Sequence, residues 1–139
     1  LIAPDQLTSA PHVFKVNFDA LKDFVPVIQL SRQPVVLAVH PKLGVGKLSD
    51  LIALVKQKPG LSYATSGVGS QQHMAAEWFG QLAGIKLEHV PYRGGAAAMT
   101  DFLAGRVDAT LATLLFARPY MQDNRALGIA VGNADPCEF

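Results

Sequence analysis

The chain has 139 residues, the size of one ordinary domain, and such a domain buries about two-thirds of its unfolded surface. Half of the residues are hydrophobic and 17% are charged, a composition that excludes a disordered chain. The formal net charge is +1 and the Lys and Arg residues are scattered, which argues against a nucleic-acid partner, because phosphate binding normally needs a clustered basic face.

Residues 1–33 are expected to form an irregular lead-in, because Pro11 and other turn-forming residues break any regular pattern. Leu1–Asp5 shows no basic region that leads into an apolar stretch, so no signal peptide is visible. The signal of an exported protein would already have been removed or would lie on a longer precursor. The short apolar run Val25–Leu30 contains Pro26, which favours an edge or connecting strand.

Residues 34–132 alternate between strand and helix patterns. The continuous apolar run Pro34–Val39 is typical of a strand buried on both faces, and Lys47–Lys58 has the spacing of an amphipathic helix. Further strands are expected at Leu61–Thr65, Leu87–Val90, Val107–Thr113 and Leu127–Val131, and further helices at Gln71–Ala83, Ala96–Ala104 and Leu114–Met121. This alternation predicts an α/β domain, a three-layer sandwich with a mostly parallel central sheet and helices on both faces.

Two further expectations concern a hydrophobic helix face and the end of the chain. Trp78, Phe79 and Leu82 share helical spacing and are expected to belong to the core. Residues 133–139 are expected to form a C-terminal tail, whose Cys137 has no partner for an intrachain disulfide.

The loop between the second expected strand and its helix is the first candidate site. In an open α/β sheet, ligands bind beyond the carboxyl ends of strands, where loops run into helix N-termini. Here the loop carries Gly67 and Gly69, which let the backbone approach a ligand closely. Ser66, Ser70 and the first free helical N–H groups offer donors to an anion, and Ser70 is also a candidate N-cap. A purely structural turn is the alternative interpretation.

The second candidate loop is Tyr92–Gly95. Tyr92 offers a hydroxyl or a flat wall, and Arg93 is a bidentate partner for a carboxylate. In the alternative interpretation, Arg93 points to water and the glycines Gly94 and Gly95 only permit a turn.

Signatures of catalysis and of metal binding are absent from the sequence. His73 and Glu77 lie four residues apart, but no H-E-x-x-H motif and no third ligand at the usual spacing accompany them. A small hydrolase or transferase that uses Ser70 and His73 is one hypothesis, although no base-orienting carboxylate accompanies the pair. The sequence therefore predicts no catalytic residue, metal or cofactor, and a protein that is not an enzyme.

Several segments occur together in a characteristic order. They are Thr65–Phe79 (TSGVGSQQHMAAEWF), Ala83–Gly84, His89–Gly94 (HVPYRG) and Asp101–Asp108 (DFLAGRVD), with Phe18–Pro26 and Val39–Pro41 upstream. Together they closely resemble the tripartite tricarboxylate transporter receptors, the Bug-type periplasmic solute-binding proteins. The resemblance covers nearly the whole chain up to about Val131.

The resemblance implies a periplasmic receptor with the type II periplasmic-binding-protein fold, two lobes that close like a Venus flytrap. Such a receptor hands a small organic carboxylate (a di- or tricarboxylate, an amino acid or an aromatic acid) to membrane permease subunits. Its ligand lies between the lobes, held by hydrogen bonds, backbone amides and waters rather than mainly by salt bridges. Residues 34–132 correspond to the second lobe, which is entered by a crossing segment within residues 1–33, and the missing first lobe is an expected partner.

Carried onto matching positions, the resemblance implies two groups of ligand contacts. The stronger candidates are Thr65, Ser66, Gly67, Gly69, Ser70 and Gln71. The weaker candidates are Tyr92, Arg93, Gly94 and Asp108. The alternative is a module derived from such a receptor that binds a partner or forms a homodimer through the former cleft, without binding solute.

Overall fold

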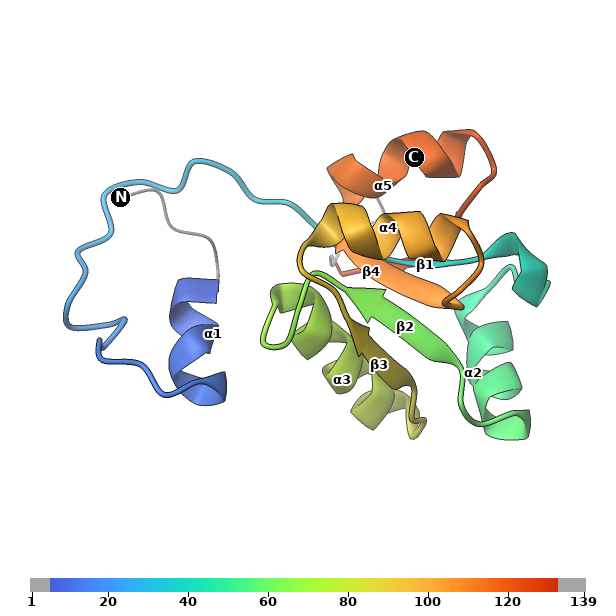
Figure 1. Ribbon diagram of the computed structural model, residues 1–139, viewed down its shortest axis with the longest axis horizontal. Coiled ribbons are helices and arrows are strands. Elements are labelled where there is room, and N and C mark those ends of the chain that lie inside the picture. Colours follow the sequence, from blue (N-terminus) through green and yellow to red (C-terminus); the bar gives the residue numbers. More distant parts are fainter. Residues whose placement is uncertain (1–5, 133–139) are drawn as a thin grey trace.

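The computed structural model describes residues 6–132, which form a sheet flanked by helices and an extended N-terminal arm (Figure 1). The tail at 133–139, with Cys137, lies outside the described residues. The strands are β1 (Val35–Val39), β2 (Ser62–Thr65), β3 (Glu88–Pro91), β4 (Ala109–Thr113) and β5 (Leu127–Val131). The helices are α1 (Gln6–Val13), α2 (Leu48–Gln57), α3 (Gln71–Ala83), α4 (Gly95–Leu103) and α5 (Leu114–Gln122), with a short 3-10 helix η1 (Pro41–Leu43).

The five strands form one sheet in the order β3-β2-β4-β1-β5. β2 pairs in parallel with both β3 and β4, whereas β1 is antiparallel to both of its neighbours, β4 and β5. β5 therefore runs in the same direction as β2, β3 and β4, and the predicted mostly parallel sheet is confirmed. The apolar run in β1 reports burial on both faces and not strand direction, since β1 is the one reversed strand.

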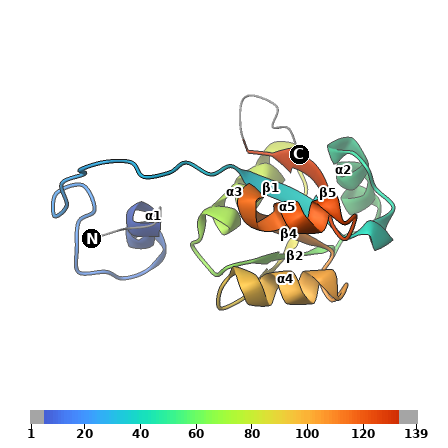
Figure 2. The same ribbon diagram turned by 90° about the horizontal axis from the view of Figure 1, so that it is seen from above.

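Side chains of β1 alternate between two hydrophobic cores. Val35, Leu37 and Val39 belong to the core that also contains side chains of α2 and α3. Val36 and Ala38 belong to the core built with α4 and α5. α2 and α4 are seen on opposite sides of the sheet in Figure 2, and this arrangement confirms the predicted three-layer sandwich.

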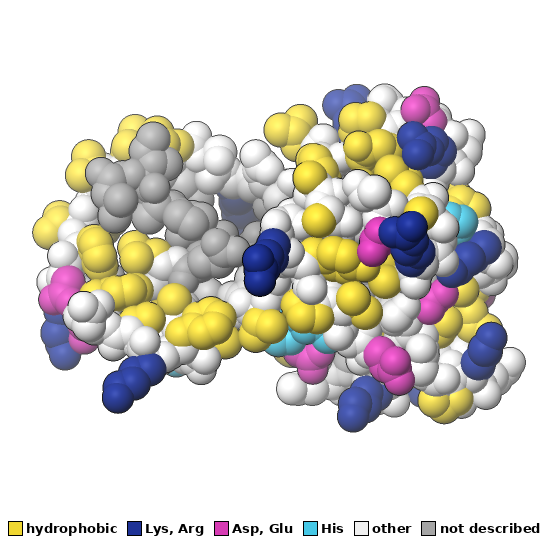
Figure 3. Space-filling view, viewed as in Figure 1, with side chains coloured by type: hydrophobic (Ala, Val, Ile, Leu, Met, Phe, Trp, Pro, Cys, Tyr) yellow, Lys and Arg dark blue, Asp and Glu magenta, His cyan; other side chains and the backbone are white. Residues whose placement is uncertain are grey.

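The arm, residues 6–33, differs from its prediction in two places. Residues 6–13 form α1 although an irregular segment was expected, because a tertiary contact overrides the weak local signal: Ser9 is buried and donates to the carbonyl of Gly69 at 3.0 Å. The predicted strand at Val25–Leu30 is wrong, since these residues belong to no helix or strand. Val27 is 93% exposed, so burial of its side chain does not offset the conformational entropy that would be lost in a strand. Figure 3 shows hydrophobic side chains at the surface of this arm, at the left of the view.

Candidate functional site

A cavity of about 300 Å³ lies at the carboxyl ends of β2 and β4, beside the N-termini of α3, α4 and α5. We call it the edge cavity. It is lined by Ser66, Gln72, Gly95, Ala96, Ala98, Met99, Thr110, Leu111, Ala112, Thr113 and Phe116. Most of these side chains are small or apolar, and a few polar groups stand among them, which is the usual composition of a small-molecule site.

The ligand loop, residues 65–70, leads from β2 into α3 and is braced by its own hydroxyls. Thr65 is fully buried, and its Oγ1 accepts the Gly67 N–H at 3.2 Å. The Ser70 hydroxyl donates to the Gly67 carbonyl at 2.8 Å and accepts the His73 N–H at 3.2 Å, which confirms Ser70 as the N-cap of α3. Thr65 and Ser70 therefore shape the loop, whereas Ser66 lines the edge cavity itself.

The two predicted loops are joined through their backbones. Tyr92 N–H donates to Thr65 O at 3.1 Å, and Gly94 N–H donates to Ser66 O at 3.2 Å. Gly94 is the N-cap of α4 and has φ 111° and ψ 160°, a conformation that residues with a Cβ rarely adopt. The structure thus brings the ligand loop and Gly94 together at the carboxyl edge of the sheet.

Two helices reach the edge cavity without a side-chain cap. Neither Gly94, before α4, nor Thr113, before α5, makes a side-chain hydrogen bond to its helix. The first N–H groups of a helix lack intrahelical partners and carry the positive end of the helix dipole. The cavity is therefore a favourable place for an anion.

Tyr92 and Arg93 do not line the edge cavity. The Tyr92 hydroxyl donates to Asp101 Oδ2 at 2.8 Å, and Asp101 also pairs with Arg106 at 2.7 Å. Burial, followed by the hydrogen bond to Asp101, raises the pKa of Tyr92 above its ordinary value. The Arg93 side chain is exposed, in agreement with the interpretation in which it points to water.

Asp108 lies at the opposite edge of the sheet. It precedes β4 and accepts two hydrogen bonds of 3.0 Å from the backbone and the hydroxyl of Ser62, the first residue of β2. Lys42 Nζ is 3.2 Å from its other carboxylate oxygen. Burial opposes ionisation, but the bonds from Ser62 and the charge of Lys42 outweigh it, so the pKa of Asp108 lies below its ordinary value. Ser62 is three residues, roughly 10 Å, from Thr65, so the structure does not bring Asp108 to the edge cavity.

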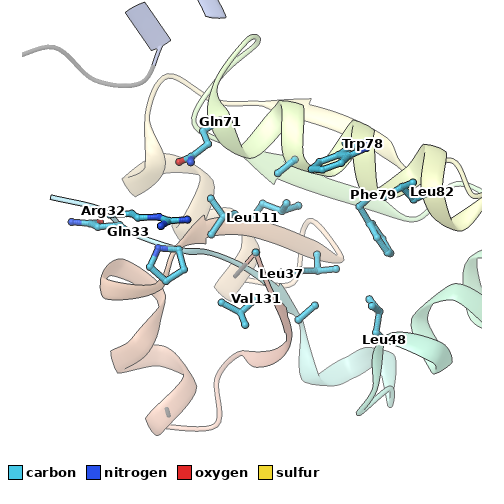
Figure 4. Close-up of a pocket in the computed structure, with 15 residues that line it drawn as sticks. Arg32, Gln33, Leu37, Leu48, Gln71, Trp78, Phe79, Leu82, Leu111 and Val131 are labelled. Carbon is cyan, nitrogen blue, oxygen red and sulfur yellow. The ribbon is translucent and has the colours of Figure 1, made fainter. Parts of the chain in front are cut away.

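Gln71 faces a second and larger cavity of about 800 Å³, on the α3 side of the sheet. Figure 4 shows this apolar groove, in which α3 contributes Trp78, Phe79 and Leu82 opposite side chains of the sheet. Trp78 is 67% exposed and Leu82 is 75% exposed, so the expectation that both are core residues is wrong. Helical spacing identified their shared face but not whether anything covers it.

The hypothesis of a hydrolase based on Ser70 and His73 is contradicted by their geometry. Ser70 is 1% exposed and its hydroxyl contacts backbone groups, while His73 Nδ1 accepts the Gly69 N–H at 3.2 Å. Neither group is free to activate the other. Within residues 6–132 no cluster of His, Cys, Asp and Glu side chains is arranged to hold a metal ion. No helix in this described range is long and apolar enough to cross a membrane.

Sequence reasoning missed part of the site. Thr113 and Phe116 line the edge cavity from the β4–α5 junction, and the carboxyl-end rule applied to that junction would have found them. Gln72 also lines the edge cavity, and it lies in the segment Thr65–Phe79, but it was not predicted as a ligand contact. The contact of Ser9 with Gly69 spans 60 residues and leaves no local signal.

A family model described as the tripartite tricarboxylate transporter family receptor matches residues 1–135. The protein BugT of Bordetella pertussis is 31% identical over 121 residues, which are 86% of this chain and 37% of BugT. A UPF0065 protein from the tcbD-tcbE intergenic region of Pseudomonas sp. (strain P51) is 32% identical over 122 residues, 87% of this chain and 36% of that protein. The chain thus spans little more than a third of the length of these relatives.

Solved structures of periplasmic proteins share the fold of this chain. Rpa4515 of R. palustris, solved with adipate, is 34% identical and superposes with a TM-score of 0.79 over 85% of this chain and 40% of that one. A periplasmic transporter is 26% identical, with a TM-score of 0.86 over 96% of this chain and 44% of that one. MatC from Rhodopseudomonas palustris, solved with malate, shares the fold at 23% identity and a TM-score of 0.84 over 93% of this chain and 45% of that one. The predicted single lobe of a periplasmic-binding-protein fold is confirmed.

Proposed function

Because the chain belongs to the tripartite tricarboxylate transporter receptor family, we propose that it binds a small organic carboxylate in the edge cavity, as the second lobe of a receptor in the periplasm. The observation that carries the proposal is the meeting of the uncapped N-termini of α4 and α5 at one small cavity beside the Ser66 hydroxyl. Backbone N–H groups and the two helix dipoles would neutralise the carboxylate. No Lys or Arg lines this cavity among the described residues, which favours hydrogen bonds over a salt bridge.

The lining also supports a class of ligand. Met99 and Phe116 offer an apolar wall to a short carbon chain, while Ser66 and Gln72 offer polar atoms. A cavity of about 300 Å³ lies at the small end of ligand sites. Relatives in this family were solved with adipate and with malate, two linear dicarboxylates, and we extend that class to this chain.

In this proposal the protein is a receptor and not an enzyme, and its output is delivery of the ligand. The second wall of the cleft comes from a first lobe, and membrane permease subunits accept the ligand. A ligand bound to one lobe makes fewer contacts and stays partly exposed to water. The isolated chain is therefore expected to bind with a dissociation constant in the millimolar range, a binding free energy of about 4 kcal/mol.

Replacing Ser66 with Ala tests the site. We expect Ser66→Ala to weaken adipate or malate binding at least about 10-fold, because a hydrogen bond to a charged group contributes roughly 1.5–3 kcal/mol. Thermal-shift titration measures this, since a ligand that binds only the native state raises the melting temperature. Ser49→Ala is the matched control, because Ser49 is exposed on α2. Equal affinities for the two variants would show that the site is misplaced.

A second candidate function, self-association, is favoured by the apolar groove on α3. Its exposed Trp78 and Leu82 would become buried in a homodimer. Sedimentation velocity should then show concentration-dependent dimers that Trp78→Glu abolishes. Leu115→Glu is the control, because Leu115 is 69% exposed on α5 and does not line the groove. A monomer at every concentration would eliminate this candidate.

A further inference from the structure

Three aromatic rings stack beneath the ligand loop. The rings of His73, on α3, and His89, on β3, lie 4.1 Å apart between centroids with 20° between their planes. Tyr63, on β2, also stacks on His89 at 4.9 Å and 22°. The cluster therefore connects α3 to the two strands β2 and β3.

Each histidine of the pair is bonded to the ligand loop. His73 Nδ1 accepts the backbone N–H of Gly69 at 3.2 Å. His89 Nε2 lies 2.7 Å from Thr65 Oγ1, the same oxygen that accepts the Gly67 N–H. The two rings thus hold opposite ends of the loop that carries Ser66 to the edge cavity.

The contact with Gly69 requires one protonation state of His73. An acceptor at Nδ1 means that the ring is neutral and carries its proton on Nε2. A second proton would occupy Nδ1, and that nitrogen would then face the Gly69 N–H as a donor. The contact would be lost, and the end of the loop next to Ser70 would lose an anchor.

Stacking adds an electrostatic reason against a positive charge on both rings at the same time. Two imidazolium rings at this separation would repel each other strongly. Burial, and then the charge of His73, lower the pKa of His89, whereas the charge of Glu77 opposes that change. Glu77, on α3, and Tyr63, on β2, are the other titratable groups against the pair, and they bond to each other at 2.7 Å.

The lowered pKa of His89 predicts how the stability of the fold changes with pH. The pKa of His89 in the fold lies below that of an unfolded histidine, so the unfolded chain binds protons more readily. The free energy of unfolding is therefore expected to fall as the pH drops from about 6.5 through the lowered pKa of His89.

We propose that His73 and His89 are positioning residues for the ligand loop, and that His73 holds the Gly69 end of the loop in its binding geometry only while its ring is neutral. This inference rests on the proposed function for its meaning, but the anchoring itself can be tested without ligand. A positive charge on His73 would also attract a carboxylate, and that effect has the opposite sign. Release of the loop predicts that affinity falls as the pH falls, whereas attraction alone predicts that it rises.

The test follows the backbone amide of Gly69 by two-dimensional NMR of the ligand-free chain, from about pH 8 to about pH 5. In the wild type the Gly69 signal should change over this pH range, because a proton on Nδ1 removes the acceptor of the Gly69 N–H. In His73→Asn, the Asn Oδ1 replaces the Nδ1 acceptor and does not titrate, so most of the pH-dependent change of the Gly69 signal should be lost. In His73→Phe the ring stays but the acceptor is lost, so the signal should be displaced at every pH.

His12→Asn is the control, because His12 is exposed on α1, and the Gly69 titration should remain in it. A Gly69 signal that is the same at about pH 8 and about pH 5 in the wild type, or one that changes with pH as much in His73→Asn as in the wild type, would overturn the proposal. If His73→Phe does not fold, His73→Asn alone decides.

A binding arm separates this inference from the proposed function. Malate affinity should fall more steeply with falling pH in the wild type than in His73→Asn, because protonation of malate itself is common to both, and a rise with falling pH in the wild type would overturn the anchoring role. If malate and adipate bind to no variant at any pH, the proposed function fails, while the ligand-free NMR result still decides the anchoring.

Discussion

Replacing Gly94 with Ala should weaken carboxylate binding at least about tenfold, equivalent to about 1.4 kcal/mol, and should destabilise the fold by about 1–3 kcal/mol. Gly94 has φ 111° and ψ 160°, and a Cβ there would meet open space, so the cost comes from the backbone conformation alone. A shift at Gly94 would break its bond to Ser66 O and displace the first N–H groups of α4 from the edge cavity.

Urea unfolding and thermal-shift titration measure the two effects of Gly94→Ala. Gly44→Ala is the matched control, since Gly44 also has a positive φ, 65°, and open space for a Cβ, and it ends η1 away from the edge cavity. This control should cost roughly 1–2 kcal/mol of stability and leave binding unchanged. Equal binding by the two variants would contradict the role given to the start of α4.

The largest expected loss of stability is that of Phe102→Ala, about 3–5 kcal/mol. Phe102 is fully buried on α4, in the core shared by α4, α5 and the sheet, and its ring meets His40 edge-to-face at 5.9 Å. Removing the ring leaves a cavity under the helix that carries Gly95 and Ala96 to the site. Since domains are stable by about 5–15 kcal/mol, this loss is a large part of the total.

Urea unfolding followed by the fluorescence of Trp78, the one tryptophan in the chain, measures this loss. Phe14→Ala is the control, because Phe14 is 53% exposed in the arm, and it should cost less than about 1 kcal/mol. A loss below about 1 kcal/mol for Phe102→Ala would mean that the α4 face is not a packed core.

The elements of the domain were predictable because their signals are local. Gln71–Ala83 was predicted with the bounds that α3 has, and β5 likewise, while the other strands and helices differ by one or two residues at their ends. The direction of β1 depends on which strands it pairs with, and no periodicity encodes that. Val25–Leu30 has the composition of a strand, but a strand also needs a neighbour.

The site was predictable where it follows from one rule. The ligand loop and Gly94 were candidates because loops at the carboxyl ends of strands meet at one edge, and the structure places both loops at that edge. Asp108 was carried over by resemblance alone, and its place before β4 puts it at the opposite edge. The role proposed for His89 depends on a ring contact between α3 and β3, which the sequence does not reveal.

The most direct test of the account is a two-dimensional NMR titration of the chain with adipate and with malate. We predict saturable shifts of the backbone amides of Ser66, Gly95, Ala96 and Thr113, around the edge cavity, with the Trp78 indole signal unchanged. Shifts confined to Trp78 and its groove, or no shift of any amide at tens of millimolar ligand, roughly ten times the expected dissociation constant, would contradict carboxylate binding at this edge.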